Sequence, residues 1–114
     1  MGNETPKISN DALYQLIRNE KFDEFNRRRT TGEKCDLRAH NFRGLDLRKL
    51  DLAGLDLSGC YFRQADMRGL NLATCKLEGA SIHEANISGV YFPKELAPEE
   101  ITLSRMVGTR MRYR

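Results

Sequence analysis

Apolar residues recur at every fifth position over the central half of the chain. From Cys35 to Lys94 the sequence divides without insertion into twelve five-residue blocks. The third residue of every block is apolar, and the first is apolar in eleven of the twelve, His40 being the exception. The second residue is Asp or Asn in eight blocks, and the fifth is Gly in six. Residues 35–94 therefore form an internal repeat.

A period of five fits neither regular element of secondary structure. On an α-helix, five residues turn through about 500°, which scatters the apolar positions around the axis. On a straight strand, an odd step places successive apolar side chains on opposite faces. The chain must therefore change direction within each block, and Gly at the fifth position allows the positive φ of a tight turn. The pattern predicts a solenoid with a filled apolar interior.

The blocks resemble those of the pentapeptide-repeat family, which read roughly Ala, Asp or Asn, Leu and two variable residues. The resemblance implies a mainly β fold, a right-handed quadrilateral β-helix with four blocks per coil, and therefore about three coils here. The recurrence of Arg43 at Arg63 and of Arg48 at Arg68 agrees with a period of twenty residues. The chain departs from the family pattern at Lys49, which ends its block without a turn-forming residue. Leucine also replaces the usual small residue at four first positions: Leu45, Leu50, Leu55 and Leu70.

The flanks of the repeat predict caps, because a solenoid end exposes apolar side chains and unpaired backbone groups. We expect one structural domain in three parts: an N-terminal helical cap over 1–34, the repeat β-helix over 35–94, and a C-terminal helical cap with a basic tail over 95–114. Residues 9–29 predict a helix with a break near Asn19, capped by Ser9 or Asn10.

The C-terminal cap predicts a helix that begins at Pro98 and ends at Gly108. Ile101, Met106 and Val107 are expected to pack inward. The tail over 109–114 alternates arginine with other residues, which fits either a short strand or a loose basic arm.

Composition limits the functional classes. The chain has 19 basic and 16 acidic residues, a formal charge of +3, and a mean hydropathy of −0.61. No stretch of 18 apolar residues occurs, so we expect no membrane span. The start of the chain lacks a signal-peptide pattern and the three cysteines are an odd number, so we expect a cytoplasmic protein with reduced thiols.

Stacking the blocks by twenties predicts one column of positive charge without a matching acidic column. This column, the neighbouring Tyr61 and the arginines of the C-terminal tail form the candidate interaction surface of seven residues: Arg43, Tyr61, Arg63, His83, Arg110, Arg112 and Arg114. Uncompensated positive charge attracts anions or an acidic partner. The alternative is a solvated face that only aids solubility.

No catalytic, metal or cofactor motif occurs in the sequence, so we expect neither an enzyme nor a bound cofactor. His40 is expected to pack inward beneath the N-terminal cap. The expected function is a protein-binding or scaffold module whose partner is another protein, and the resemblance also implies a homodimer through the C-terminal end. Nucleic-acid binding through the basic face and tail is an alternative. A second alternative, a DNA-mimicking modulator of DNA gyrase, comes from the family and is disfavoured by the short, basic chain.

Overall fold

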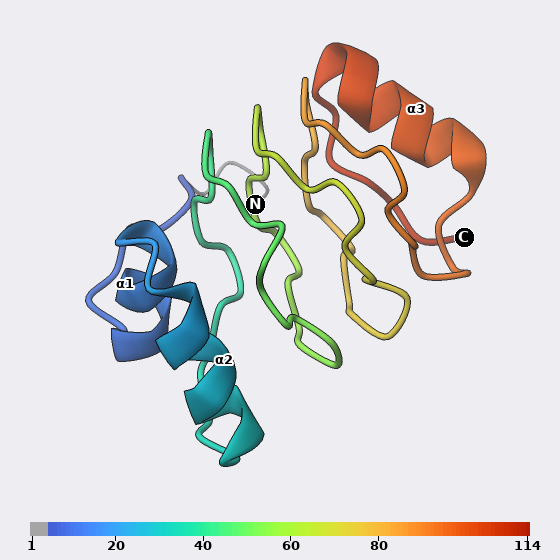
Figure 1. Ribbon diagram of the computed structural model, residues 1–114. Coiled ribbons are helices and arrows are strands. Elements are labelled where there is room, and N and C mark those ends of the chain that lie inside the picture. Colours follow the sequence, from blue (N-terminus) through green and yellow to red (C-terminus); the bar gives the residue numbers. More distant parts are fainter. Residues whose placement is uncertain (1–4) are drawn as a thin grey trace.

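Three helices lie at the two ends of a stack of coils in the computed structural model, which describes residues 5–114. Helices α1 (Ala12–Arg18) and α2 (Phe22–Thr30) pack at the N-terminal end, and α3 (Pro98–Val107) lies across the C-terminal end (Figure 1). The repeat over 35–94 forms the coils between them. The first four residues of the predicted N-terminal cap lie outside the described residues.

The coils advance by twenty residues each, as the sequence predicts. Parallel bridges join residues twenty positions apart: Asn41 with Tyr61, Tyr61 with Ser81, Asp46 with Asp66, Asp66 with Asn86, Asp56 with Lys76, and Asn71 with Tyr91. Four blocks therefore make one coil. Each bridge stands alone, so the chain over 5–114 contains helices and isolated bridges rather than the strands expected of a mainly β fold. The turn at the end of each block stops a ladder from growing along the chain.

Two features recur in most blocks and stabilise the turns. All eight Asp or Asn side chains at the second position accept a hydrogen bond from the backbone N–H two residues later, as Asp46 does from Arg48 at 3.1 Å. The fifth residue has a positive φ in nine blocks, including all six glycines, which explains why glycine recurs there. Lys49 is not among the nine, in line with its departure from the pattern.

The core is the column of third-position side chains. Ten of the twelve are buried, and the other two, Ile87 and Phe92, are partly buried. The rings of Phe42 and Phe62 stack at 5.3 Å between adjacent coils. The two partly buried residues belong to the last coil, which has no further coil above it. The prediction of one continuous apolar interior is therefore confirmed.

The N-terminal cap covers the first coil with α1 and α2, so the predicted break between two helical segments is confirmed. Leu13, Tyr14, Ile17 and Phe25 are buried against the repeat. The predicted helix cap at Ser9 or Asn10 is wrong. The helix begins after Asp11, whose side chain accepts from the Tyr14 N–H at 2.9 Å.

His40 lies beneath this cap, as predicted, and only 2% of it is exposed. Its Nδ1 lies 2.8 Å from the Arg38 carbonyl oxygen and its Nε2 lies 2.7 Å from the Ser9 hydroxyl. The Tyr14 ring packs against the imidazole, with 4.4 Å between ring centroids. Ser9 therefore binds the core histidine instead of capping α1.

The C-terminal cap contacts the last coil with only one side of α3. α3 begins at Pro98 and ends at Gly108, which has φ +85°, both as predicted. Ile101 is partly buried and Ser104 is fully buried, but Met106 and Val107 are 67% and 60% exposed, so their predicted inward packing is wrong. Residues 101, 104 and 108 share the inner side of the helix, which leaves 106 and 107 on the other side.

The tail over 109–114 is an extended segment fixed to the last coil rather than a loose arm. Met111 is fully buried, and its backbone N–H donates to the Ala80 carbonyl at 2.9 Å. The Gly79 N–H donates to the Met111 carbonyl at 2.7 Å. The Tyr113 hydroxyl accepts from the Leu77 N–H at 2.8 Å. The tail thus supplies acceptors where the carbonyls of another coil would lie.

Candidate interaction surface

The bridge column Asn41–Tyr61–Ser81 sets the geometry of the candidate surface. In each of these blocks the fourth residue lies two positions beyond the bridge, so Arg43, Arg63 and His83 come from three successive coils. Coils joined by such bridges lie about 4.8 Å apart. The structure therefore brings the predicted basic column together.

Arg63 lies at the centre of this column. Its Nη2 donates to Nδ1 of His83 at 2.7 Å, and its guanidinium carbon lies 5.4 Å from the centroid of the Tyr61 ring. Arg110 from the tail also lies against Tyr61, with its guanidinium carbon 5.0 Å from the ring centroid. Its Nη1 donates to the Gly79 carbonyl at 2.8 Å. Two guanidinium groups thus share one aromatic ring.

The side-chain amide of Gln64 links Arg43 to Glu84. Arg43 Nε donates to Gln64 Oε1 at 3.1 Å, and Gln64 Nε2 donates to Glu84 Oε1 at 2.9 Å. Together with Arg63 and His83, these residues line a hollow of about 210 Å³. The predicted face therefore includes one carboxylate, Glu84, which is the fifth residue of its block and so lies outside the predicted column of fourth-position residues.

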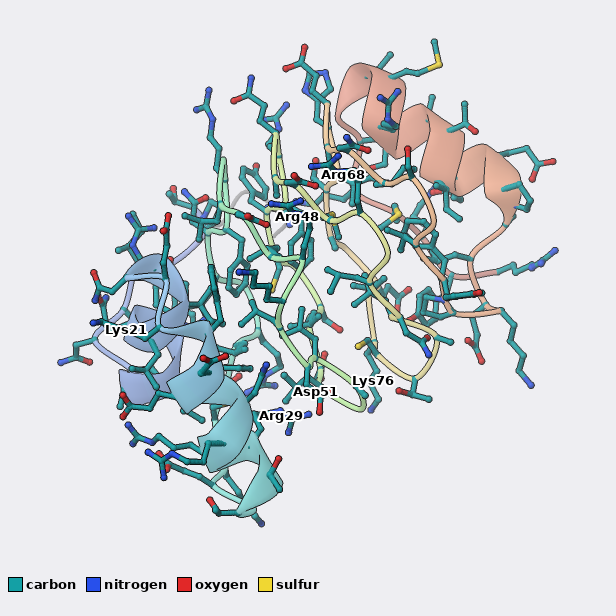
Figure 2. The ribbon with its side chains drawn as sticks, in the orientation of Figure 1. Lys21, Arg29, Arg48, Asp51, Arg68 and Lys76 are labelled. Carbon is teal, nitrogen blue, oxygen red and sulfur yellow. The ribbon has the colours of Figure 1, made fainter. Side chains whose placement is uncertain are left out.

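In the neighbouring column of the same fold, carboxylates neutralise the charge of the arginines. Arg48 and Arg68 occupy the same repeat position as Arg43 and Arg63, and each forms a two-point contact with Asp46 or Asp66 in its own block. Arg48 also reaches Asp66 of the next coil at 3.3 Å. Arg48 and Arg68 are labelled in Figure 2. Hydrogen bonds from the Arg48 side chain, and then from its backbone N–H, lower the pKa of Asp46 to about 2.

The contrast follows from the second residue of each block. Where it is Asp, the arginine finds a carboxylate; where it is Asn41 or Tyr61, it does not. Among residues 5–114, no carboxylate lies within ion-pair distance of Arg43 or Arg63, whose side chains bind Gln64 and His83 instead. The charge of this column is therefore available to a partner.

The other tail arginines lie apart from this column. Arg112 pairs with Glu100 of α3 at 3.1 Å, and Arg114 Nη2 donates to the Lys94 carbonyl at 3.4 Å. Of the predicted surface, the structure assembles five residues, which we call the basic face: Arg43, Tyr61, Arg63, His83 and Arg110.

Comparison with known proteins identifies the repeat. The family described as Pentapeptide repeats matches residues 33–64 and 56–92, with eight copies of the repeat. The chain belongs to the pentapeptide-repeat family. Neither the curated proteins nor the solved structures that were searched contain a significant match to this pentapeptide-repeat protein.

A second surface of the pentapeptide-repeat protein was missed from the sequence. Leu103, Met106 and Val107 are exposed on α3, and with Pro98, Glu99 and Thr102 they line a shallow hollow of about 510 Å³. We call these six residues the α3 face. Exposed apolar groups on one side of a short helix make the α3 face a candidate interaction site. The spacing of the apolar residues 103, 106 and 107 carried this signal, but the side of α3 that contacts the coils was not known.

Two of the three cysteines, Cys60 and Cys75, are buried in the core, and Cys35 is partly buried against it. All three cysteines are free, and burial raises the pKa of the Cys60 thiol to about 12. Among residues 5–114, no three His, Cys, Asp or Glu side chains converge on a point where a metal ion would bind. Within the same residues, no helix has the length and apolar character that crossing a membrane requires.

Proposed function

We propose that this pentapeptide-repeat protein is a non-catalytic binding module whose basic face receives an acidic surface of another protein. The observation that supports it most strongly is the contrast between two equivalent columns. Arg48 and Arg68 have carboxylate partners, whereas Arg43 and Arg63 have none among residues 5–114. Charge that the fold leaves uncompensated steers an oppositely charged partner and fixes its orientation.

The rest of the chain fits a rigid support for such a face. We infer that the stacked coils form the right-handed quadrilateral β-helix of the family, because its twenty-residue coil is the period of the bridges. The Tyr61 backbone is fixed to the preceding coil, since its N–H donates to the His40 carbonyl at 3.0 Å and its carbonyl accepts from the Phe42 N–H at 2.7 Å. The His83 carbonyl accepts from the Gln64 N–H at 2.8 Å. We place the protein in the cytoplasm, since its three cysteines are unpaired.

Nucleic acid is the second candidate for the same face. Its support is the combination of Tyr61 with the guanidinium groups of Arg63 and Arg110, since basic and aromatic side chains together bind phosphates and bases. The known action of some family members on DNA gyrase, through mimicry of duplex DNA, is disfavoured for this chain. Its formal charge is +3, the opposite sign to that of DNA.

We also propose that two copies pair through the α3 face. α3 begins with Glu99 and Glu100 and has Arg105 in its last turn. An antiparallel pair of these helices buries Met106 and brings the Glu99 end of one copy against the Arg105 end of the other. The arrangement is self-complementary, as a two-fold interface requires. It leaves the basic face of each copy open to its partner.

The experiment compares two double variants in affinity capture from the native host. Arg43→Ala with Arg63→Ala removes the uncompensated charge, and Arg48→Ala with Arg68→Ala removes the same charge from the paired column. We expect loss of one defined protein with the first variant only. The same two variants are tested for binding to duplex DNA at several salt concentrations. Steeply salt-dependent DNA binding that is lost with the first variant replaces the protein proposal with the nucleic-acid one.

A further inference from the structure

The hollow of the basic face is lined by two arginines that use few of their hydrogen-bond donors within the described part of the chain. Among residues 5–114, the Arg63 side chain has one hydrogen bond, from Nη2 to His83, and the Arg43 side chain has one, from Nε to Gln64. Both side chains line the same hollow of about 210 Å³. Guanidinium groups present paired donors that match the oxygens of phosphate and carboxylate.

The contact between Arg63 and His83 assigns the roles of the two groups. A guanidinium group only donates hydrogen bonds, so Nδ1 of His83 accepts in this arrangement. A proton on Nδ1 removes the acceptor and places a second cation 2.7 Å from Nη2 of Arg63. The two cations then repel each other, and an anion bound beside them offsets this repulsion.

We propose that Arg43, Arg63 and His83 form a binding site for a dianionic tetrahedral oxyanion, the phosphate class, and that His83 takes up a proton when the anion binds. The proposal rests on the proposed function, since it names the chemical group of the partner that the basic face recognises. It adds that recognition strengthens as the pH falls.

The charges around the hollow favour a dianion. With His83 protonated, the lining carries three cations and the carboxylate of Glu84, an excess of two positive charges. Glu84 is drawn toward Gln64 by the bond at 2.9 Å. Arg110 adds positive charge beside the Tyr61 ring. Arg105 of α3 lies near Glu84, since its carbonyl accepts from the Glu84 N–H at 3.0 Å. A single carboxylate leaves one of these charges unmatched.

The end of α3 lies against the Arg63–His83 pair. A Cβ added to Gly108 would lie 2.7 Å from Nη2 of Arg63 and 3.1 Å from Nδ1 of His83. Glycine at this position therefore leaves room for the two side chains, and it also allows the positive φ of 85° that ends α3.

The test is a sulfate titration of the full chain followed by nuclear magnetic resonance of the histidine rings. Sulfate is the probe because it stays a dianion from about pH 5.5 to about pH 8, whereas a phosphate group takes up a proton near pH 6. We expect the His83 ring signals to shift with sulfate while those of buried His40 stay unchanged. Sulfate affinity is expected to rise at least about fivefold from the higher pH to the lower, a typical size for coupled binding.

Four variants make the result specific. Arg63→Ala and His83→Gln should each abolish the pH dependence, and Arg63→Ala should also lose most sulfate binding. Glu84→Gln should tighten sulfate binding, because it removes the one negative charge of the lining. Arg68→Ala, from the compensated column, should bind sulfate as the wild type does. Equal losses in Arg68→Ala and Arg63→Ala would mean general surface charge and would overturn the site.

Two further probes identify the source of the anion. Inorganic phosphate and phosphoserine are titrated under the same conditions, with acetate as the carboxylate probe. Phosphoserine binding at least as tightly as phosphate assigns the group to a modified partner protein, and exclusion of phosphoserine assigns it to the free ion. Acetate binding more tightly than sulfate contradicts the dianion. Sulfate binding to a chain whose captured partner survives the loss of Arg43 and Arg63 would sink the proposed function and leave this site standing.

Discussion

The side-chain amide of Asn26 takes the place of a backbone peptide group beside Asp51. Its Oδ1 accepts from the Asp51 N–H at 2.8 Å, and its Nδ2 donates to the Lys49 carbonyl, also at 2.8 Å. Arg29, one turn further along α2, donates to the Asp51 carbonyl at 3.4 Å (Figure 2). The N-terminal cap thus continues the hydrogen bonding of the coils with side chains where no further coil exists.

Removing this amide should loosen the first coil. Asn26→Ala removes the hydrogen bonds to the Asp51 N–H and to the Lys49 carbonyl, and each should cost about 0.5–1.5 kcal/mol in the free energy of unfolding. Arg27→Ala is the control, since its side chain is 66% exposed and its contact to Glu24 is long. Urea unfolding measures both. Equal stabilities of the two variants would mean that the amide contributes nothing to capping.

The repeat could be predicted from the sequence because each position of a block has one structural role. Leu47 points inward, Asp46 closes a turn, and Gly44 takes a positive φ, and each role selects a residue type. The caps lack this redundancy. The rotation of α3 about its own axis decides whether Ile101 or Met106 faces the coils, and the sequence of its ten residues is compatible with both orientations. The hydrogen bond from the Ile82 N–H to the Ser104 hydroxyl selects one orientation, and no local sequence pattern predicts that bond.

The apolar column should provide most of the stability of the fold. Phe62 is 1% exposed and stacks on Phe42, so Phe62→Ala should lower the free energy of unfolding by about 3–5 kcal/mol. Arg43→Ala, an exposed position of the adjoining coil, should change it by less than about 0.5 kcal/mol. Urea melts compare the two. A loss below about 1 kcal/mol for Phe62→Ala would contradict the central place of this residue in the core.

The paired column of Arg48 and Arg68 should make the free energy of unfolding depend on pH in the acid range. Arg48 lowers the pKa of Asp46 to about 2 in the folded chain, below the ordinary value near 3.9. A carboxyl with a lowered folded pKa stabilises the fold above its unfolded pKa, and that contribution is lost as the pH falls through the folded value. The loss should therefore occur between about pH 4 and about pH 2.

Asp46→Asn isolates this effect, because the amide oxygen keeps the turn while the charge is removed. The stability difference between wild type and Asp46→Asn should be small, since the pair is largely exposed, and should vanish at the acid end of the range and in high salt. Urea unfolding over a pH series gives this difference. A difference that stays constant with pH would show that the charge has no part in it.

The α3 face should hold two copies together. Met106→Glu places a charge at the centre of the apolar side of α3 and should convert the dimer to a monomer in sedimentation velocity. Ile8→Glu is the matched control, because Ile8 is also an exposed apolar residue, at 62%, but lies at the other end of the stack. A wild-type chain that sediments as a monomer at high concentration would refute the proposed pairing.

The candidate site was accessible from the sequence only in part. The stacking of Arg43, Arg63 and His83 followed from the twenty-residue period, because a regular repeat places equivalent positions one above another. The position of Arg110 over Tyr61 did not, since it depends on where the tail docks. That Arg112 pairs with Glu100 and lies apart from the basic face could not be predicted either, because it also depends on where the tail docks.

The most direct measurement of the proposed function is the affinity of the purified partner for two double variants at moderate salt. Arg43→Ala with Arg63→Ala should weaken binding at least about tenfold, which corresponds to about 1.4 kcal/mol. Arg48→Ala with Arg68→Ala should leave it within about twofold, because these arginines already neutralise Asp46 and Asp66. Equal losses from the two columns, or a larger loss from the paired column, would contradict the account.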